Sequence, residues 1–182
     1  MHPTIDDYLT NADRFDAVVS ASTDADWTAP SPCSEWTAAG VLDHVVETQR
    51  SFLTERGADI GEPPAGTPTE IWASHVTAVA AATTDDDFVS SEYDGYFGRT
   101  TLADTLANFY GFDMIVHRWD LGRALGHDVT WDEPEMDRLE QAMAAFGDAI
   151  YSEGVCGPAV EVPANASRQD RILGRLGRRP TA

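Results

Sequence analysis

Apolar residues recur at helical spacing in five segments of the chain, whereas the alternating pattern of a half-buried strand is almost absent. Residues that favour a helix start precede each segment: Thr or Asp, often with an acid three positions later or Pro at the first helical position. The pattern predicts helices that begin after Thr4, Thr37, Thr67, Thr101 and Asp132 and that end near residues 22, 57, 83, 126 and 151.

Between the third and fourth helices, the acidic and aromatic segment 84–100 is too irregular for a helix and too rich in Gly and Asp for a strand. We therefore expect a long loop there. The tail, from about residue 154 to 182, ends in a short basic amphipathic stretch. Together these patterns predict an all-α fold: an up-down four-helix bundle with an additional C-terminal helix and tail, in one domain of residues 1–182.

Charge narrows the range of partners. The chain has 31 acidic and 12 basic residues, all of the latter Arg, and a net charge of −19. Such a surface repels phosphate backbones and anionic lipids, so we expect neither nucleic acid nor a membrane as a partner. Neither a long apolar run nor a signal peptide is visible, which predicts a cytoplasmic protein with both cysteines reduced. Either a GC-rich genome or adaptation to high salt would account for the absence of Lys.

The stretch FYGFDMIVHRWDLGRALG, residues 109–126, places polar groups inside an otherwise apolar helix. Asp113 and His117 are four residues apart and therefore share a helix face, and Asp120 follows on nearly the same side. A carboxylate and an imidazole in apolar surroundings are solvated, paired with each other or bound to a metal. We expect Asp120 to accept a hydrogen bond from His117 or an Arg.

His44 is the candidate for a third ligand, because it lies beside the apolar stripe of the second predicted helix. One ligand from that helix and two from a later one would hold a divalent metal, with zinc favoured and nickel or manganese as alternatives. Three protein ligands would leave a position open for water or substrate. The competing interpretation is structural: Asp113 and His117 form an interior hydrogen bond, and His44 is a core histidine with a satisfied ring.

Three blocks of sequence, WTAPSPCSEWTAAGVLDHVV, FDMIVHRWDLGRALG and GPAVEVPANASRQDRILGRLGRRP, resemble the mycothiol-dependent maleylpyruvate isomerase-like proteins of the DinB-like superfamily, specifically its small single-domain branch. The resemblance implies a four-helix bundle with a divalent metal on His44, Asp113 and His117. Members of this superfamily more often have His or Glu where this chain has Asp113. Because Asp is shorter than Glu by one methylene group, Asp113 either ligates the metal with a shifted backbone or orients His117.

The same resemblance implies a thiol cofactor such as mycothiol, which a metal would ionise for transfer to an electrophile or for cis–trans isomerisation. A length of 182 residues leaves no room for the α/β domain of the isomerase itself, so we do not expect maleylpyruvate isomerisation. Two alternatives stay open. One is a metal-dependent hydrolase on the same residues. The other is a non-catalytic bundle that forms a homodimer or binds a small ligand.

Some residues outside the predicted metal site are weaker candidates for a functional role. Segment 93–100, with aromatic residues and Arg99 among glycines, is either a lid over a pocket, in which Arg99 meets an anionic substrate or cofactor, or a loop packed on the bundle. Cys33 could reach a metal, but without a nearby second cysteine we interpret it as a buried loop thiol. Trp36 is expected to be a core anchor, and His75 a surface group.

Overall fold

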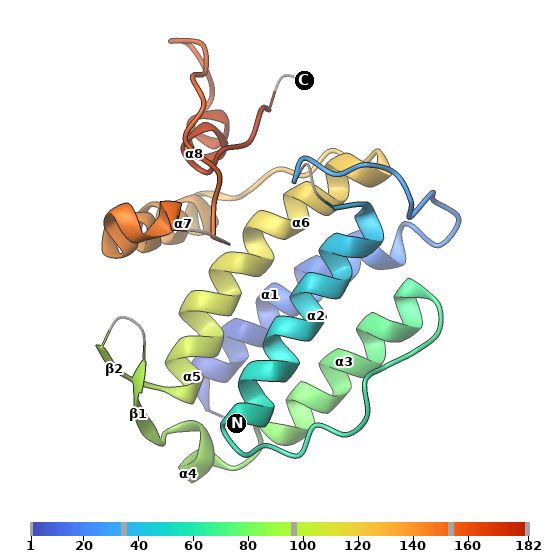
Figure 1. Ribbon diagram of the computed structural model, residues 1–182, viewed down its shortest axis with the longest axis vertical. Helices are drawn as coiled ribbons and strands as arrows, with labels where there is room; N and C mark the ends of the chain where they lie inside the picture. The colour runs from blue at the N-terminus through green and yellow to red at the C-terminus, as the bar shows by residue number, and fades with distance from the viewer. Residues whose placement is uncertain (1, 34–35, 96–97, 153–154, 181–182) are drawn as a thin grey trace. The chain divides into compact units, whose positions relative to one another are not determined.

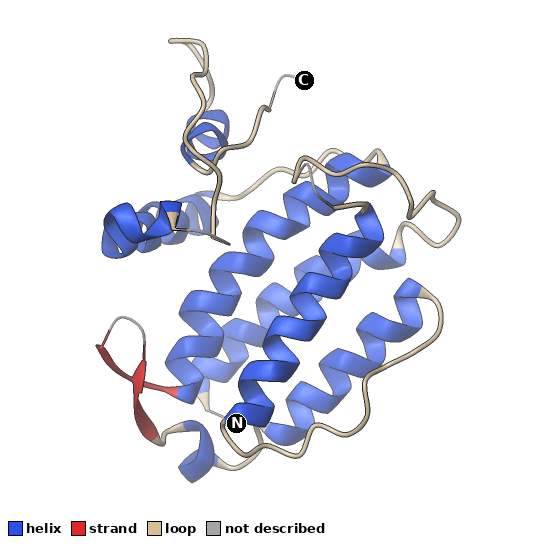
Figure 2. Cartoon of the chain, viewed as in Figure 1, coloured by secondary structure: helices blue, strands red, loops and turns tan. Residues whose placement is uncertain are grey.

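The computed structural model describes residues 2–33, 36–95, 98–152 and 155–180. The chain divides into two compact units, residues 1–128 and 129–182. The described chain is mostly helical, with one small two-stranded sheet (Figure 2). The prediction of an all-α fold is therefore confirmed, whereas the assignment of residues 1–182 to a single domain stays a prediction.

Four helices form a bundle in the first unit: α1 (Pro3–Ser20), α2 (Ala38–Glu55), α3 (Pro68–Ala82) and α6 (Gly111–Leu125). They are arranged in a ring, because α1 and α2 each contact both α3 and α6. Helices α1 and α6 run in one direction, and α2 and α3 run in the other (Figure 1). The connection 56–67 travels back along the bundle, so that α3 begins at the same end as α2.

Several helix ends follow from the sequence. The Thr67 side chain accepts from the Glu70 backbone N–H and the Glu70 carboxylate accepts from Thr67, which confirms the predicted capping box. The Thr101 hydroxyl likewise accepts from the backbone N–H three residues later. The predicted cap at Thr4 is wrong. Helix α1 begins at Pro3, whose fixed φ suits the first helical position, so Thr4 already lies inside the helix.

The predicted loop 84–100 is also wrong. It contains a short helix, α4 (Asp86–Val89), and an antiparallel hairpin of β1 (Glu92–Gly95) and β2 (Gly98–Thr101). Tertiary contacts stabilise these short strands. The Tyr93 hydroxyl lies 2.6 Å from the Thr105 hydroxyl, and the Arg56 guanidinium lies over the Tyr93 ring, 3.9 Å from its centre.

The long fourth helix is present but is not uniform. It starts with α5 (Leu102–Asp104), continues as a π-helical segment, η1 (Thr105–Tyr110), and becomes the regular helix α6. Its end at Gly126 is confirmed, with a left-handed φ of 79°. A π-helical turn holds more residues than an α-helical one, so η1 changes the angle at which every following side chain leaves the helix axis.

Apolar side chains of all four helices fill the bundle core, and Phe15 of α1 packs on Trp72 of α3 with ring centres 4.6 Å apart. A polar cluster is buried within this core. His75 and Gln49 are both fully buried, and the His75 Nε2 atom lies 2.8 Å from the Gln49 side-chain oxygen. The expectation that His75 is a surface group is therefore wrong.

The second unit contains α7 (Glu133–Phe146), a 3-10 turn, η2 (Gly147–Tyr151), and the short helix α8 (Arg168–Arg175). The Asp132 cap of α7 is confirmed. Arg168 of α8 pairs with three carboxylates of α7, those of Glu133, Asp137 and Glu140. Among the described residues of the whole chain, no helix has the length and apolar content needed to cross a bilayer.

Candidate metal centre

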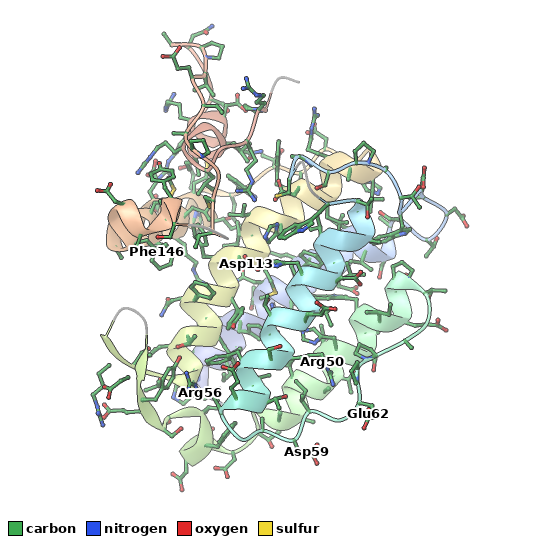
Figure 3. All side chains as sticks on the ribbon, viewed as in Figure 1. Arg50, Arg56, Asp59, Glu62, Asp113 and Phe146 are labelled. Carbon is green, nitrogen blue, oxygen red and sulfur yellow. The ribbon has the colours of Figure 1, made fainter. Side chains whose placement is uncertain are left out.

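The structure brings the three candidate ligands together between α2 and α6 (Figure 3, where Asp113 is labelled). One Asp113 oxygen, Oδ1, lies 3.3 Å from Nε2 of His117 and 3.8 Å from Nε2 of His44. One potential ligand atom from each residue lies within 4.8 Å of those of the other two. The i, i+4 spacing on α6 thus makes the contact that the sequence predicts, and α2 adds the third group.

The π-helical segment η1 ends at Tyr110, one turn before Asp113, and the Tyr110 side chain contacts α2. The Tyr110 hydroxyl donates to the backbone carbonyl of Thr48, one turn beyond His44, and the Tyr110 ring packs on Phe52. These contacts join α6 to α2 next to the candidate ligands. The sequence contains no recognisable signal for this segment, because a local irregularity of this kind is determined by packing between helices.

Asp120 has the supporting position that the sequence predicts. Its side chain is fully buried, and its Oδ2 atom lies 2.9 Å from Nδ1 of His117. Because a carboxylate only accepts, His117 donates its Nδ1 hydrogen to Asp120. This hydrogen bond fixes the ring orientation and directs Nε2 toward Asp113.

Asp113 supplies the strongest sign that the cluster suits a cation. Its Oδ2 atom is buried and has no hydrogen-bond partner in the described part of the chain. Burial by itself would raise the pKa of Asp113, but the facing rings of His117 and His44 outweigh it and lower this pKa well below its usual range. Burial would similarly lower the pKa of His117, but Asp113 and Asp120 raise it well above the usual value. The cluster therefore stabilises positive charge between Asp113 and His117.

The loop before α2 contributes two side chains whose roles differ from the sequence interpretation. Trp36, expected to be a core anchor, is half-buried and stacks on the His44 ring, with ring centres 4.4 Å apart. Cys33, expected to be a buried loop thiol, is half-buried, and its Sγ lies 3.4 Å from Oδ2 of Asp120. No local pattern indicates this second contact, because the two residues are 87 positions apart in the sequence.

Arg99, the candidate cofactor-binding residue, lies on strand β2. Its side chain is 63% exposed and pairs with Glu92 at 2.8 Å and with Asp94 at 3.9 Å, so nearby carboxylates of the same hairpin already compensate its charge. Its role in cofactor binding stays a prediction. The other aromatic residues of the predicted lid, Tyr96 and Phe97, fall outside the described part of the chain.

Two imidazole nitrogens and a carboxylate oxygen are a donor set that divalent transition metals accept, zinc among them. The short His117–Asp113 contact and the partnerless Asp113 oxygen both fit such an ion. A metal there would replace the hydrogen that Nε2 of His117 carries when this ring is protonated, because a ligating imidazole must be neutral on the bound nitrogen. Three protein ligands would leave coordination positions for a water or a substrate atom.

The bundle and its comparisons define the class of this protein, which is a DinB-like helical bundle. Residues 9–122 match the family described as the mycothiol maleylpyruvate isomerase N-terminal domain, and the chain belongs to this family. The matched range includes all three candidate ligands and Asp120, and thus confirms the family resemblance noted from the sequence.

Two proteins of Mycobacterium tuberculosis are similar to this chain: uncharacterized protein MT0763 of strain CDC 1551 / Oshkosh and uncharacterized protein Rv0738 of strain ATCC 25618 / H37Rv. Each is 31% identical over 130 residues, which cover 69% of this chain and 69% of the relative. No solved structure matches the chain. The names of these two relatives assign no activity.

Proposed function

We propose that the protein binds one divalent metal ion, zinc in the first place, through His44, Asp113 and His117, and that it acts as a thiol-dependent transferase or isomerase with mycothiol or a similar small thiol. The observation that carries the proposal is the convergence of the three side chains: Oδ1 of Asp113 faces both histidine rings, while its other oxygen, Oδ2, is buried without a hydrogen-bond partner among the described residues. The family supports the thiol, because its description includes mycothiol.

Each residue has a distinct part in this proposal. His44 and His117 supply neutral nitrogen ligands, and Asp113 supplies the charged oxygen that compensates half of the charge of a divalent ion. Asp120 holds His117 in the tautomer whose Nε2 is available. When bound, the metal would lower the pKa of a coordinated thiol so that it reacts as a thiolate with an electrophilic small molecule.

Two rival functions use the same cluster differently. In a hydrolase, the metal would activate a water molecule instead of a thiol. In a non-catalytic bundle, Asp113 and the two histidines would only pair with one another, and the protein would act as a homodimer or as a small-ligand binder. The partnerless Asp113 oxygen favours the metal over the last alternative, because an ion pair alone leaves this buried atom without compensation.

Metal content is the first test. The protein is purified without chelator, incubated with zinc, nickel, manganese or iron(II) and desalted, and its metal is measured by mass spectrometry. We expect about one ion per chain, lost in His117→Ala and weakened at least about tenfold in His44→Ala. His127→Ala is the matched control, because the His127 ring contacts Ser22 rather than the cluster. A protein that retains none of these metals would refute the metal site and both enzymatic functions.

Asp113→Asn separates the two roles left open for this residue. Asn keeps the size but loses the charge. A role limited to orienting His117 predicts the loss of about 10–100-fold in metal affinity that is typical for a direct partner of a ligand, whereas a ligand role predicts a larger loss. The thiol is tested on the metal-loaded protein by thermal shift with mycothiol. A thiol present at a hundred times its Kd would add about 2.7 kcal/mol to the free energy of unfolding. Metal binding without a shift would favour the hydrolase.

A further inference from the structure

Two donors converge on one oxygen atom behind the candidate metal site. Oδ2 of the fully buried Asp120 lies 2.9 Å from Nδ1 of His117 and 3.4 Å from Sγ of Cys33. A thiol donates a weak hydrogen bond, and a distance of this size is normal when sulfur is the donor. A buried carboxylate has lost its water shell, so each hydrogen bond that it receives matters for its orientation and for its charge.

The backbone around Cys33 is held in place by hydrogen bonds of its own loop. The carbonyl of Cys33 accepts from the Trp36 backbone N–H at 2.8 Å and from the Ser31 hydroxyl at 3.0 Å. Trp36 in turn stacks on His44. One short loop therefore contacts both candidate histidine ligands. The Trp36 ring packs on His44 and also on His117, with ring centres 5.6 Å apart in the second pair, and the Cys33 thiol reaches Asp120, the partner of His117.

We infer that Cys33 is a positioning residue of this site: its thiol donates to Asp120 and so holds the carboxylate that fixes the ring of His117. Without this donor the carboxylate rotates more easily about its own side-chain bonds, and the ring of His117 then loses part of its fixed direction toward Asp113. With Cys33 in place, its loop, the Asp120 carboxylate and the His117 ring are linked by hydrogen bonds, so that Nε2 of His117 already points toward Asp113 in the metal-free protein.

The inference rests on the proposed function for its effect on metal affinity, but the hydrogen-bond arrangement itself is testable without metal. In the metal-free protein, the Nδ1 hydrogen of His117 is bonded to a carboxylate and should give a downfield, slowly exchanging proton resonance, assigned by its loss in His117→Ala. In Cys33→Ala we expect this resonance to shift or to broaden through faster exchange with water. We also expect the affinity for cobalt or zinc to fall about 3–10-fold. This loss is smaller than the loss expected when a residue in direct contact with a metal ligand is replaced.

Cys33→Ser separates the hydrogen bond from simple packing. Serine is smaller than cysteine, so both variants lose volume, but only serine keeps a donor on the β-carbon. We expect Cys33→Ser to restore the resonance and most of the metal affinity. Cys156→Ala is the control for loss of a thiol elsewhere in the chain, and thermal melting of all variants shows how far each one is destabilised.

The outcomes are distinguishable. If Cys33→Ala leaves both the His117 resonance and the metal affinity unchanged, the positioning role is refuted, even where the melting temperature falls. If Ala and Ser variants behave alike, the contact acts through packing, and the inference is likewise refuted. If the wild-type protein binds no metal, the proposed function fails, and the resonance in the metal-free protein still decides whether Cys33 holds Asp120.

Discussion

His75 should make the stability of the fold depend on pH in a specific way. The ring is fully buried between α2 and α3, and its Nε2 atom contacts the Gln49 side-chain oxygen, which also accepts from the Tyr8 hydroxyl at 2.5 Å. Burial lowers the pKa of His75 from 6.5 to about 3, and the positive charge of Arg50 contributes in the same direction. The folded protein therefore keeps this ring neutral across the ordinary pH range.

The sign and the size of the effect follow from proton linkage. Above pH 6.5 the ring is neutral in both the folded and the unfolded chain, and it adds no pH dependence. As the pH falls below 6.5, the unfolded chain takes up a proton that the folded chain refuses, so acid favours unfolding until the pH reaches about 3. The slope is about 1.4 kcal/mol per pH unit, and between pH 7 and pH 5 His75 should cost the fold about 2 kcal/mol.

The assay compares urea unfolding of the wild-type protein and His75→Gln at several values between pH 5 and pH 7. Glutamine does not titrate, so the variant should lose about 2 kcal/mol less on acidification, whatever its stability at pH 7, because the other titrating groups are common to both proteins. A difference between the two free energies of unfolding that stays constant with pH would refute the argument. A His75 ring resonance that titrates near pH 6.5 in the folded protein would refute it independently.

Three further predictions concern stability. Gly126→Ala should lower the free energy of unfolding by about 1 kcal/mol in urea titrations. Gly126 has a φ of 79°, and no described atom would lie within 4 Å of the added methyl group, so the cost is conformational. Gly157→Ala, at a residue without this conformation, should change the free energy of unfolding little. Arg50→Met should cost about 2–3 kcal/mol and expose segment 56–67 to proteolysis, because the buried guanidinium donates to three successive carbonyl groups of that connection (residues 60–62; Arg50 and Glu62 are labelled in Figure 3). If the net charge of −19 reflects adaptation to salt, KCl should raise the melting temperature through screening, and a flat or falling dependence would count against that origin.

Helix starts could be predicted from the sequence because their causes are local. The Thr67 and Asp132 capping boxes form as expected, since each involves groups only three residues apart. The exception, Thr4, shows how two local signals compete: Pro3 also suits a first helical position, and it determines where α1 begins. Local chemistry thus predicts the elements well, with errors of a residue or two at their ends.

Features stabilised by distant contacts could not be predicted in the same way. The β1–β2 hairpin lies in a segment whose composition is typical of a loop, and Arg56 and Thr105, both outside the segment, contact its Tyr93. The prediction that His75 is a surface group is wrong for a related reason. On α3 it follows Trp72 by one turn and lies on the buried face, but its partner Gln49 is on a different helix. Burial of a polar group is visible only when that partner is known.

The candidate site combines both kinds of information. Asp113 and His117 meet because of helical periodicity, which is why their spacing alone was informative. His44 meets Asp113, and Cys33 meets Asp120, only through the packing of α2 and of the preceding loop. The sequence alone predicts the first as a ligand and the second as a buried loop thiol. The apolar stripe of the second predicted helix already favours His44 as the third ligand, and the family resemblance implies the same residue.

The functional hypotheses make different predictions for the hydrogens on the two ring nitrogens of His117. Nδ1 contacts Asp120, and Nε2 contacts Asp113, so one ring reports on both sides of the site. A protein in which Nδ1 keeps its hydrogen bond while Nε2 exchanges its hydrogen for a metal would behave as the proposed function requires. If both nitrogens keep their hydrogens in the presence of every metal tested, the His117 ring instead forms an internal ionic cluster with the carboxylates of Asp113 and Asp120. The function would then have to be sought in ligand binding or dimerisation.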